Sequence, residues 1–390
     1  MSARRVFLYV QHLLGVGHLK RAMTLAAALA EHGLEVTLAS GGFAPPDAPA
    51  PGVRWVQLPA AGTADTGFST LVDAAGRPVD DAWKAARSAA LLAAWRDADP
   101  DVLIVELFPF GRRMMRFELL PLLEAARAAP RPPVIVCSVR DLLGGKIERA
   151  RHEKIAAQVE AHFDHVLVHG DPAVVPFERT FLCTGRIAGR IAYTGYIVDA
   201  RLATHGDPDA GRDEVIVSAG GGAVGARLLD AAIRARPLTA LAQRTWRVLA
   251  GVNLPDADFA ALQARIAQAG EGRVILERSR RDFTVLLKNG FLSISQVGYN
   301  TTMELLQAGI RAVGVPFAAG AEIEQTLRAR LLAARGLLEL LEERALSPAA
   351  LAAAVDRAAA RAPAARAAID LSGAARSAAL IAGWAQARSR

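Results

Sequence analysis

A group of polar residues between positions 295 and 328 could hold a polar ligand. Residues 292–295 (LSIS) and 312–316 (AVGVP) have the composition of two buried strands, and a helix is expected after each. Thr301 and Glu304 have the spacing of a capping box, which predicts that the first helix opens at Thr301. Open α/β sheets bind ligands at the carboxyl ends of their strands, where these side chains would gather. They are Ser295, Asn300, Thr301, Glu304, Glu324, Gln325 and Arg328.

A candidate general base follows the first predicted strand, residues 4–10 (RRVFLYV). Gly15 and Gly17 let the backbone of the next turn pass close to a ligand, and the following helix N-terminus adds amide donors. The third glycine of a dinucleotide fingerprint is missing. His18 ends this turn, and a neutral imidazole can remove a proton from a hydroxyl group. The alternative is that His18 only caps the helix.

A second glycine-rich turn follows a strand that ends near Ser218. Its glycines permit a pyrophosphate to approach the backbone and the helix N-terminus beyond, with Ser218 as a further donor. No Gly-Lys-Ser/Thr sequence follows, so the turn is not a Walker loop. No metal is expected to hold the diphosphate, because the glycine turn and the helix N-terminus could do so. The glycines are Gly220, Gly221, Gly222 and Gly225.

These segments resemble the GT-B glycosyltransferases, most closely the enzyme branch that adds N-acetylglucosamine to the lipid-linked peptidoglycan precursor. The resemblance rests on a Ser-x-x-Gly-x-x-Thr-x-x-Glu segment, a later Glu-Gln pair and the Gly-x-Gly-His-x-x-Arg turn, which also recurs in UDP-sugar hydrolases. It implies an α/β fold of two Rossmann-like domains facing a cleft, with His18 beside the reacting sugar. Glu304 would accept hydrogen bonds from the ribose, and Glu324 and Gln325 from the donor sugar. The implied donor-binding set is Gly17, Ser218, Gly220, Gly221, Gly222, Gly225, Ser295, Gly298, Asn300, Thr301, Glu304, Glu324 and Gln325.

The acceptor side is expected at two other strand ends. One predicted strand ends at Glu106 and is followed by a segment that mixes aromatic residues such as Phe108 with arginines such as Arg112. This segment is either an acceptor- or membrane-facing patch, or a helix packed on the sheet with a solvated basic face. A second strand ends at Arg140 and Asp141. Asp141 would orient His18 or contact the acceptor, and a helix cap is the alternative.

Composition narrows the class of protein. The chain has 390 residues, 52% of them hydrophobic and 22% charged, which suits two globular domains. No apolar run reaches the ~18 residues of a membrane span, and no signal-peptide cleavage site follows the N-terminus. Cys137 and Cys183 form no metal or disulfide pattern, so a cytoplasmic location is expected, with the inner face of the membrane as a variant. The formal charge is +7, but the sequence has no basic run with interleaved aromatic residues. Anionic ligands or an anionic membrane surface are therefore expected, and nucleic acid is not.

We expect four segments: an acceptor-side domain (1–200), a linker (201–214), a nucleotide-sugar-binding domain (215–370) and a C-terminal helix (371–390) that crosses back to the first domain as in relatives. The expected reaction is metal-independent, inverting transfer of a sugar from a UDP-sugar to the hydroxyl of a lipid or small molecule. His18 would be the base, with Asp141 beside it, and no cofactor is required. A UDP-sugar hydrolase using the same turn and a non-catalytic sugar-nucleotide-binding protein are the alternatives.

Overall fold

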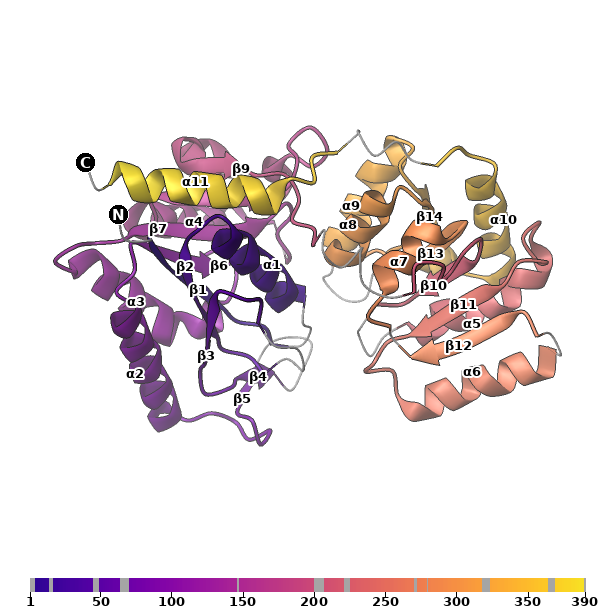
Figure 1. Ribbon diagram of the computed structural model, residues 1–390, viewed down its shortest axis with the longest axis horizontal. Coiled ribbons are helices and arrows are strands. Elements are labelled where there is room, and N and C mark those ends of the chain that lie inside the picture. The colour runs from indigo at the N-terminus through magenta and orange to yellow at the C-terminus, as the bar shows by residue number, and fades with distance from the viewer. Residues whose placement is uncertain are drawn as a thin grey trace. The chain divides into compact units, whose positions relative to one another are not determined.

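The chain divides into two compact units in a computed structural model (Figure 1): Met1–Ile197 with Asp370–Arg390, and Val198–Ile369. The structure describes residues 4–13, 17–44, 49–63, 70–145, 147–199, 207–220, 225–269, 272–278, 280–317, 323–363 and 369–388. Residues 201–206 of the linker predicted at 201–214 lie outside these ranges. Its described end belongs to the second unit, where the Asn289 side chain donates to the carbonyls of Pro208 (2.6 Å) and Ala210 (3.0 Å).

The first unit is built on a seven-stranded sheet in which every strand runs parallel to its neighbours. The strand order is β3 (Val53–Gln57), β2 (Glu35–Ser40), β1 (Arg5–Val10), β6 (Val102–Glu106), β7 (Val134–Arg140), β8 (His165–His169) and β9 (Ile191–Tyr193). A separate antiparallel pair joins β4 (Gly62–Thr63) to β5 (Leu71–Val72). Because parallel sheets are covered on both faces, their strands are nearly continuously apolar, as VLIVE at β6 shows.

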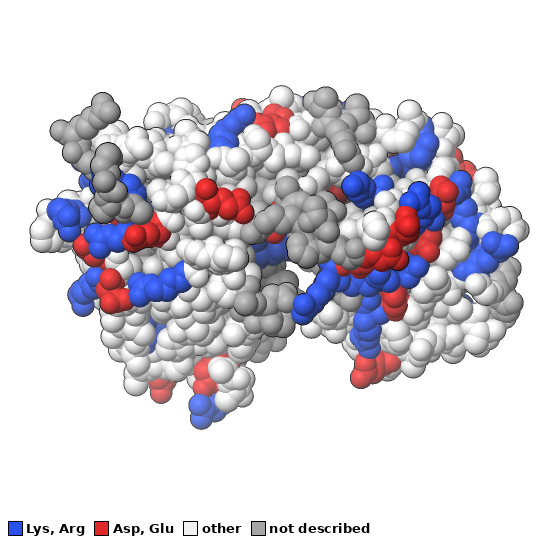
Figure 2. All heavy atoms as spheres, viewed as in Figure 1, with Lys and Arg blue, Asp and Glu red and all other residues white. Residues whose placement is uncertain are grey.

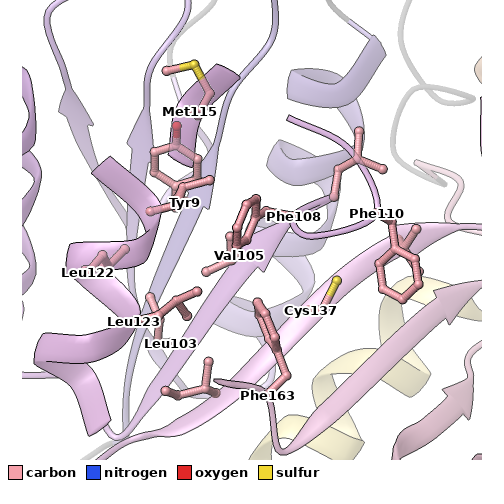
Figure 3. Close-up of a cluster of buried hydrophobic side chains, with 14 of the residues drawn as sticks. Tyr9, Leu103, Val105, Phe108, Phe110, Met115, Leu122, Leu123, Cys137 and Phe163 are labelled. Carbon is pink, nitrogen blue, oxygen red and sulfur yellow. The ribbon is translucent and has the colours of Figure 1, made fainter. Parts of the chain in front are cut away.

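Helices cover both faces of this sheet. Residues of α2 (Asp81–Ala98), α3 (Arg116–Ala128) and α4 (Arg149–His162) pack with Phe7, Tyr9, Leu103 and Val105 on one face (Figure 3). On the other face, α1 (Gly17–Glu31) and the C-terminal helix α11 (Gly373–Ala387) pack with Val6, Leu8 and Val10. The helix after position 371 therefore lies in the first unit. Three 3-10 segments, η1 (Arg113–Met115), η2 (Phe177–Arg179) and η3 (Thr184–Arg190), complete the unit.

The second unit repeats the plan with six parallel strands. Their order is β12 (Val274–Arg278), β11 (Trp246–Ala250), β10 (Val215–Ser218), β13 (Leu292–Gln296), β14 (Arg311–Val315) and β15 (Glu339–Leu340). Its helices are α5 (Ala226–Ala235), α6 (Asp256–Ala269), α7 (Phe283–Asn289), α8 (Tyr299–Ala308), α9 (Glu324–Ala334) and α10 (Pro348–Ala359), with 3-10 turns η5 (Arg236–Leu238) and η6 (Glu343–Ala345). The expected class of two Rossmann-like α/β domains is confirmed.

The strand order reverses direction once in each unit. Successive connections run outward one way from β1 to β3 and the other way from β6 onward, and likewise from β10 to β12 and from β13 onward. Such a reversal leaves a crevice at the carboxyl ends of the two central strands, which is where open α/β sheets bind ligands. The fold therefore offers one ligand-binding edge in each unit: after β1 and β6, and after β10 and β13.

The surface charge is largely used in ion pairs. On the face shown in Figure 2, basic side chains lie next to acidic ones over the second unit. Arg247, for example, donates to both Glu214 (2.6 Å) and Glu277 (2.6 Å). Among the described residues, no helix combines the length and apolar character that crossing a membrane requires.

Candidate functional site

The reversal point of the first unit brings His18 and Glu106 into direct contact. His18 is the second residue of α1, and Glu106 is the last residue of β6. The Nδ1 atom of His18 lies 2.7 Å from Oε1 of Glu106, and the side chains are 17% and 1% exposed. Arg21, one helical turn after His18, donates Nη2 to the same carboxylate oxygen. Glu106, predicted for the acceptor side, is therefore a hydrogen-bond partner of the candidate base.

The electrostatics of this group keep the carboxylate charged and the imidazole neutral. Burial lowers the pKa of His18 to about 3, although the nearby Glu106 charge opposes this shift. Burial raises the pKa of Glu106, but the interactions of the carboxylate with His18 and Arg21 more than offset this effect and lower the pKa to about 2. Near neutral pH an ionised carboxylate can only accept a hydrogen bond, so Nδ1 of His18 must carry the proton. The Nε2 atom then has a free lone pair and can accept a proton from a hydroxyl group or water.

Asp141, the other predicted catalytic residue, lies fully buried just beyond the end of β7. Its Oδ1 accepts a hydrogen bond from the amide of Leu142 at 2.9 Å. The carboxylate that contacts His18 is thus Glu106 on β6. Sequence reasoning reached Glu106 as a strand end, but no local signal joined it to a histidine 88 positions earlier.

The aromatic and basic residues that follow β6 separate in the structure. Phe108 is 1% exposed and packs in the core with Tyr9 and Val105 (Figure 3), so it forms no part of an exposed patch. Arg112 is half-buried, has a left-handed backbone (φ 57°) and donates Nε to the carbonyl of Gln11 at 2.7 Å. Of the two expectations for this segment, a patch that faces the acceptor or a membrane and a helix packed on the sheet, Phe108 fits the second, because it is buried in the core.

The glycine turn that was predicted to bind the diphosphate follows β10, at the reversal point of the second unit. Ser218 ends β10, and its hydroxyl accepts from the amide of Gly220 at 3.2 Å. Gly220 and Gly225 have left-handed φ values of 73° and 126°, and a Cβ atom at position 225 would lie 2.3 Å from that of Ala219. Gly225 is also the N-cap of α5, and as a glycine it has no side chain with which to cap the first amides of the helix. Gly221 and Gly222 lie outside the described residues.

The predicted capping box is wrong. Helix α8 begins at Tyr299, and its N-cap is Gly298, with no side-chain hydrogen bond at the cap. Thr301 therefore lies inside the first turn, and Glu304 lies in the second, where it cannot reach back to a capping residue. The hydroxyl that bonds the helix start is that of Thr302, which donates to the Gly298 carbonyl at 2.8 Å. Glu304 therefore does not serve as the capping carboxylate that the spacing predicted.

The remaining predicted donor residues lie on or beside the same edge. Asn300, Thr301 and Glu304 are half-buried on α8, whereas Ser295 is fully buried and pairs with the hydroxyl of Ser293 at 2.8 Å. Glu324, 3% exposed, opens α9. Gln325 follows it and accepts through Oε1 from the amide of Phe317 at 3.1 Å, which ties α9 to the segment after β14.

A cavity of about 240 Å³ opens between the start of α5 and the ends of β13 and β14. Gly225, Gln296 and Phe317 are among its lining residues. Gln296 and Phe317 were not predicted for the site, although Gln296 directly follows Ser295 in the motif. The cavity places a polar side chain and an aromatic ring next to the glycine turn, so it can hold part of a ligand whose anionic group lies at the α5 N-terminus.

No group of three or more His, Cys, Asp or Glu side chains suited to a metal ion occurs among the described residues. Part of the second unit matches a known protein family. Residues 262–381 match the glycosyltransferase family 28 C-terminal domain. No curated protein matched the chain by sequence.

Solved structures that cover almost the whole chain share its fold. MurG of Acinetobacter baumannii has a TM-score of 0.57 at 16% identity, covering 97% of this chain and 99% of its own. The calicheamicin glycosyltransferase CalG4 has a TM-score of 0.57 at 17% identity, covering 99% and 97%. Os79 from O. sativa, solved in complex with UDP, has a TM-score of 0.58 at 15% identity, covering 97% and 100%. At these identities the likeness establishes the fold.

Proposed function

We propose that the chain is a glycosyltransferase that moves a sugar from a UDP-sugar to an acceptor hydroxyl with inversion. The match of residues 262–381 to the glycosyltransferase family 28 C-terminal domain, together with the fold that the chain shares with solved glycosyltransferases, supports this proposal. The observation that carries this proposal is the pair of His18 and Glu106 at the reversal point of the first sheet. It supplies a neutral base whose outer nitrogen is available. A hydroxyl group has a high pKa, and such a base lowers the barrier to its attack.

In the proposed step, Nε2 of His18 takes the proton of the acceptor hydroxyl while the oxygen of that hydroxyl attacks the anomeric carbon of the donor sugar. The bond from that carbon to the β-phosphate oxygen breaks, and UDP leaves with the bonding electrons. Attack from the side opposite the leaving group inverts the anomeric configuration. Glu106 holds the Nδ1 proton and stabilises the imidazolium that forms, as the carboxylate of a catalytic triad does.

The second unit would hold the donor. The turn containing Gly220 and Gly225 and the N-terminus of α5 would bind the diphosphate through backbone amides, without a metal. Glu304 would accept from the ribose hydroxyls, and Glu324 and Gln325 would read the sugar. UDP as the nucleotide is supported by two similar structures, Os79 with UDP and Phytolacca americana UGT2 with UDP-2-fluoroglucose and pterostilbene.

A lipid acceptor at an anionic membrane surface remains part of the proposal. It is supported by the arginines after β6, of which Arg113 and Arg116 are exposed. Vesicles containing anionic lipid should then retain the chain more strongly than neutral vesicles at low salt, and ~0.5 M salt should release it.

The test of the donor site is thermal unfolding of the full chain with UDP, GDP and dTDP. UDP at about a hundred times its dissociation constant should add roughly 2.7 kcal/mol to stability. Glu304→Gln keeps the shape of the side chain but removes its charge, and should abolish most of this shift. Asp258→Asn, on α6, is the matched control and should leave the shift unchanged. If none of the three nucleotides stabilises the chain, a nucleotide-sugar transferase is excluded.

Incubation of the preferred UDP-sugar in water alone then separates transfer from hydrolysis. Transfer predicts little UDP release until an acceptor is added, and a product of inverted anomeric configuration by proton NMR. His18→Ala should abolish the UDP release that follows addition of the acceptor. Rapid release without acceptor would instead identify a hydrolase that uses the same base.

A further inference from the structure

Three arginines surround the His18–Glu106 pair at the carboxyl edge of the first sheet. Arg21 lies on α1, Arg112 follows β6, and Arg140 is the last residue of β7. Their strands are neighbours, since β1 pairs with β6 and β6 with β7. Among the described residues at the ends of these strands, the carboxylates are Glu106 and Asp141, so the three guanidinium groups outnumber them.

Most of the negative charge at this edge is already engaged. Oε1 of Glu106 is shared between Nδ1 of His18 and Arg21, and Oδ1 of Asp141 accepts from a backbone amide. Arg112 is held by its Nε atom, which donates to the Gln11 carbonyl at 2.7 Å. Within the part of the chain that the structure describes, its two terminal nitrogens have no hydrogen-bond partner. A guanidinium anchored by Nε presents the other nitrogens as a fork.

Arg112 is near other charged groups of this edge. Burial, and then the positive charges of Arg140 and Arg21, lower the pKa of Arg112 against the opposing effect of Glu106. Arg112 in turn contributes to the lowered pKa of His18, after burial. The guanidinium is therefore near the imidazole, and an anion bound to it would relieve repulsion among the arginines. Arg112 also keeps a left-handed backbone that costs a non-glycine residue energy, in keeping with a functional constraint.

From this arrangement we propose that the acceptor carries an oxyanion, a phosphate or a carboxylate, which Arg112 and Arg140 bind beside the hydroxyl that His18 deprotonates. The proposal rests on the proposed transferase function for its second half only, because the anion site itself requires no donor. Planar guanidinium groups suit both oxyanions through paired N–H donors. The site would select acceptors by charge, since a neutral acceptor offers no counter-charge to the fork of Arg112.

The first test needs neither donor nor acceptor. Thermal unfolding of the full chain is followed with increasing inorganic phosphate or acetate, against sodium chloride at equal ionic strength. Phosphate or acetate should stabilise the chain more than chloride. Arg112→Ala should weaken the apparent affinity roughly 10- to 150-fold, the range expected for hydrogen bonds to a charged group. Arg140→Ala should do the same. Arg113→Ala, the exposed neighbour, should keep the affinity of wild type.

Two results of this test would overturn the anion site: equal stabilisation by chloride, or an unchanged affinity in Arg112→Ala and Arg140→Ala. Arg112→Lys keeps the charge without the fork and should give an intermediate affinity. If Arg112→Ala does not fold, Arg112→Lys and Arg140→Ala still decide the question. A UDP-induced thermal shift in each variant serves as evidence that the second unit remains folded.

The second test uses three acceptors that differ in charge, glycerol, glycerate and glycerol 3-phosphate, with the preferred UDP-sugar. UDP release should rise at least about tenfold more with one of the charged acceptors than with glycerol, and Arg112→Lys should reduce that preference. The charged acceptor that responds identifies the oxyanion. Equal rates with all three would overturn selection by charge. If UDP stabilises the chain but anions do not, the anion site is wrong and the transferase proposal stands. If anions stabilise the chain but UDP does not, the transferase proposal is wrong and the anion site stands.

Discussion

Glu106 sets which nitrogen of His18 carries a proton, so its charge should matter for rate more than for binding. Glu106→Gln keeps the shape but removes the charge that stabilises an imidazolium. We expect kcat to fall about 10²- to 10⁴-fold, while KM for the UDP-sugar stays within a factor of about three. Steady-state UDP release measures both. Glu160→Gln, on an exposed pair with Arg186, is the control. An unchanged kcat would show that the pair has no catalytic role.

The low pKa of His18 also shapes the dependence of rate on pH. A base works only when deprotonated, and the pKa of about 3 keeps His18 deprotonated throughout the range from pH 5 to 8. We therefore expect kcat/KM to lack an acid limb near pH 6.5, where an ordinary histidine would produce one. A tenfold loss per pH unit below pH 6.5 would show that His18 titrates as an ordinary histidine and is not held neutral by burial.

At the scale of elements, His169 links three neighbouring strands. It is fully buried at the end of β8, and its ring contacts Ser138 of β7 (2.7 Å) and Thr194 beyond β9 (3.0 Å). Burial lowers its pKa to about 3. The unfolded chain, with a pKa near 6.5, binds more protons between these values, so acid favours unfolding. We expect this residue alone to cost about 2 kcal/mol between pH 7 and pH 5.

Urea unfolding at the two pH values measures this loss. His169→Gln cannot titrate, so its stability should depend on pH less steeply than that of wild type, whatever its stability at pH 7. His32→Gln, exposed at the end of α1, should leave the slope unchanged. An identical slope in wild type and His169→Gln would mean that His169 is not held neutral.

A buried ion pair joins α2 to α3. Arg87 and Glu118 are both 0% exposed and contact at 2.7 Å, and Arg87 also donates to Gln11 Oε1 (2.6 Å) after β1. Arg87→Met would leave a buried carboxylate uncompensated and should lower the free energy of unfolding by about 3–5 kcal/mol. Arg186→Met breaks an exposed pair and should cost at most about 1 kcal/mol. Chemical denaturation compares them. A small loss in Arg87→Met would mean that water or another cation replaces the pair.

At the scale of the whole molecule, the C-terminal helix completes the first unit. Ile381 and Ala385 are buried on the sheet face that α1 covers, and Trp384 stacks on His165 with ring centroids 3.8 Å apart. Removing residues 370–390 should destabilise the first unit by more than about 3 kcal/mol, counting the Ile381 side chain and the aromatic pair. Stabilisation of the second unit by UDP should persist. Hydrogen exchange of each unit, with and without UDP, would detect the difference, and equal protection of the first unit after the deletion would contradict it.

The sequence by itself determined the alternation of strands and helices and the positions where strands end. Both follow from local patterns: apolar runs such as RRVFLYV and VLIVE, and glycine turns after them. From these patterns and the rule that ligands bind at carboxyl ends, His18, Glu106 and the glycine turn after Ser218 could be placed at ligand-binding edges. The α/β class needed no more than this.

Only the tertiary structure decided which strand ends meet. Glu106 reaches His18 because β6 pairs with β1, an arrangement set by crossover connections that no local segment encodes. Phe108 turned inward because packing of the core outweighs the polar character of its neighbours. The Thr301–Glu304 spacing failed as a cap because the N-cap of the helix is Gly298, three residues before Thr301. Pairing and packing act between residues distant in the chain, so a local pattern proposes partners but cannot choose among them.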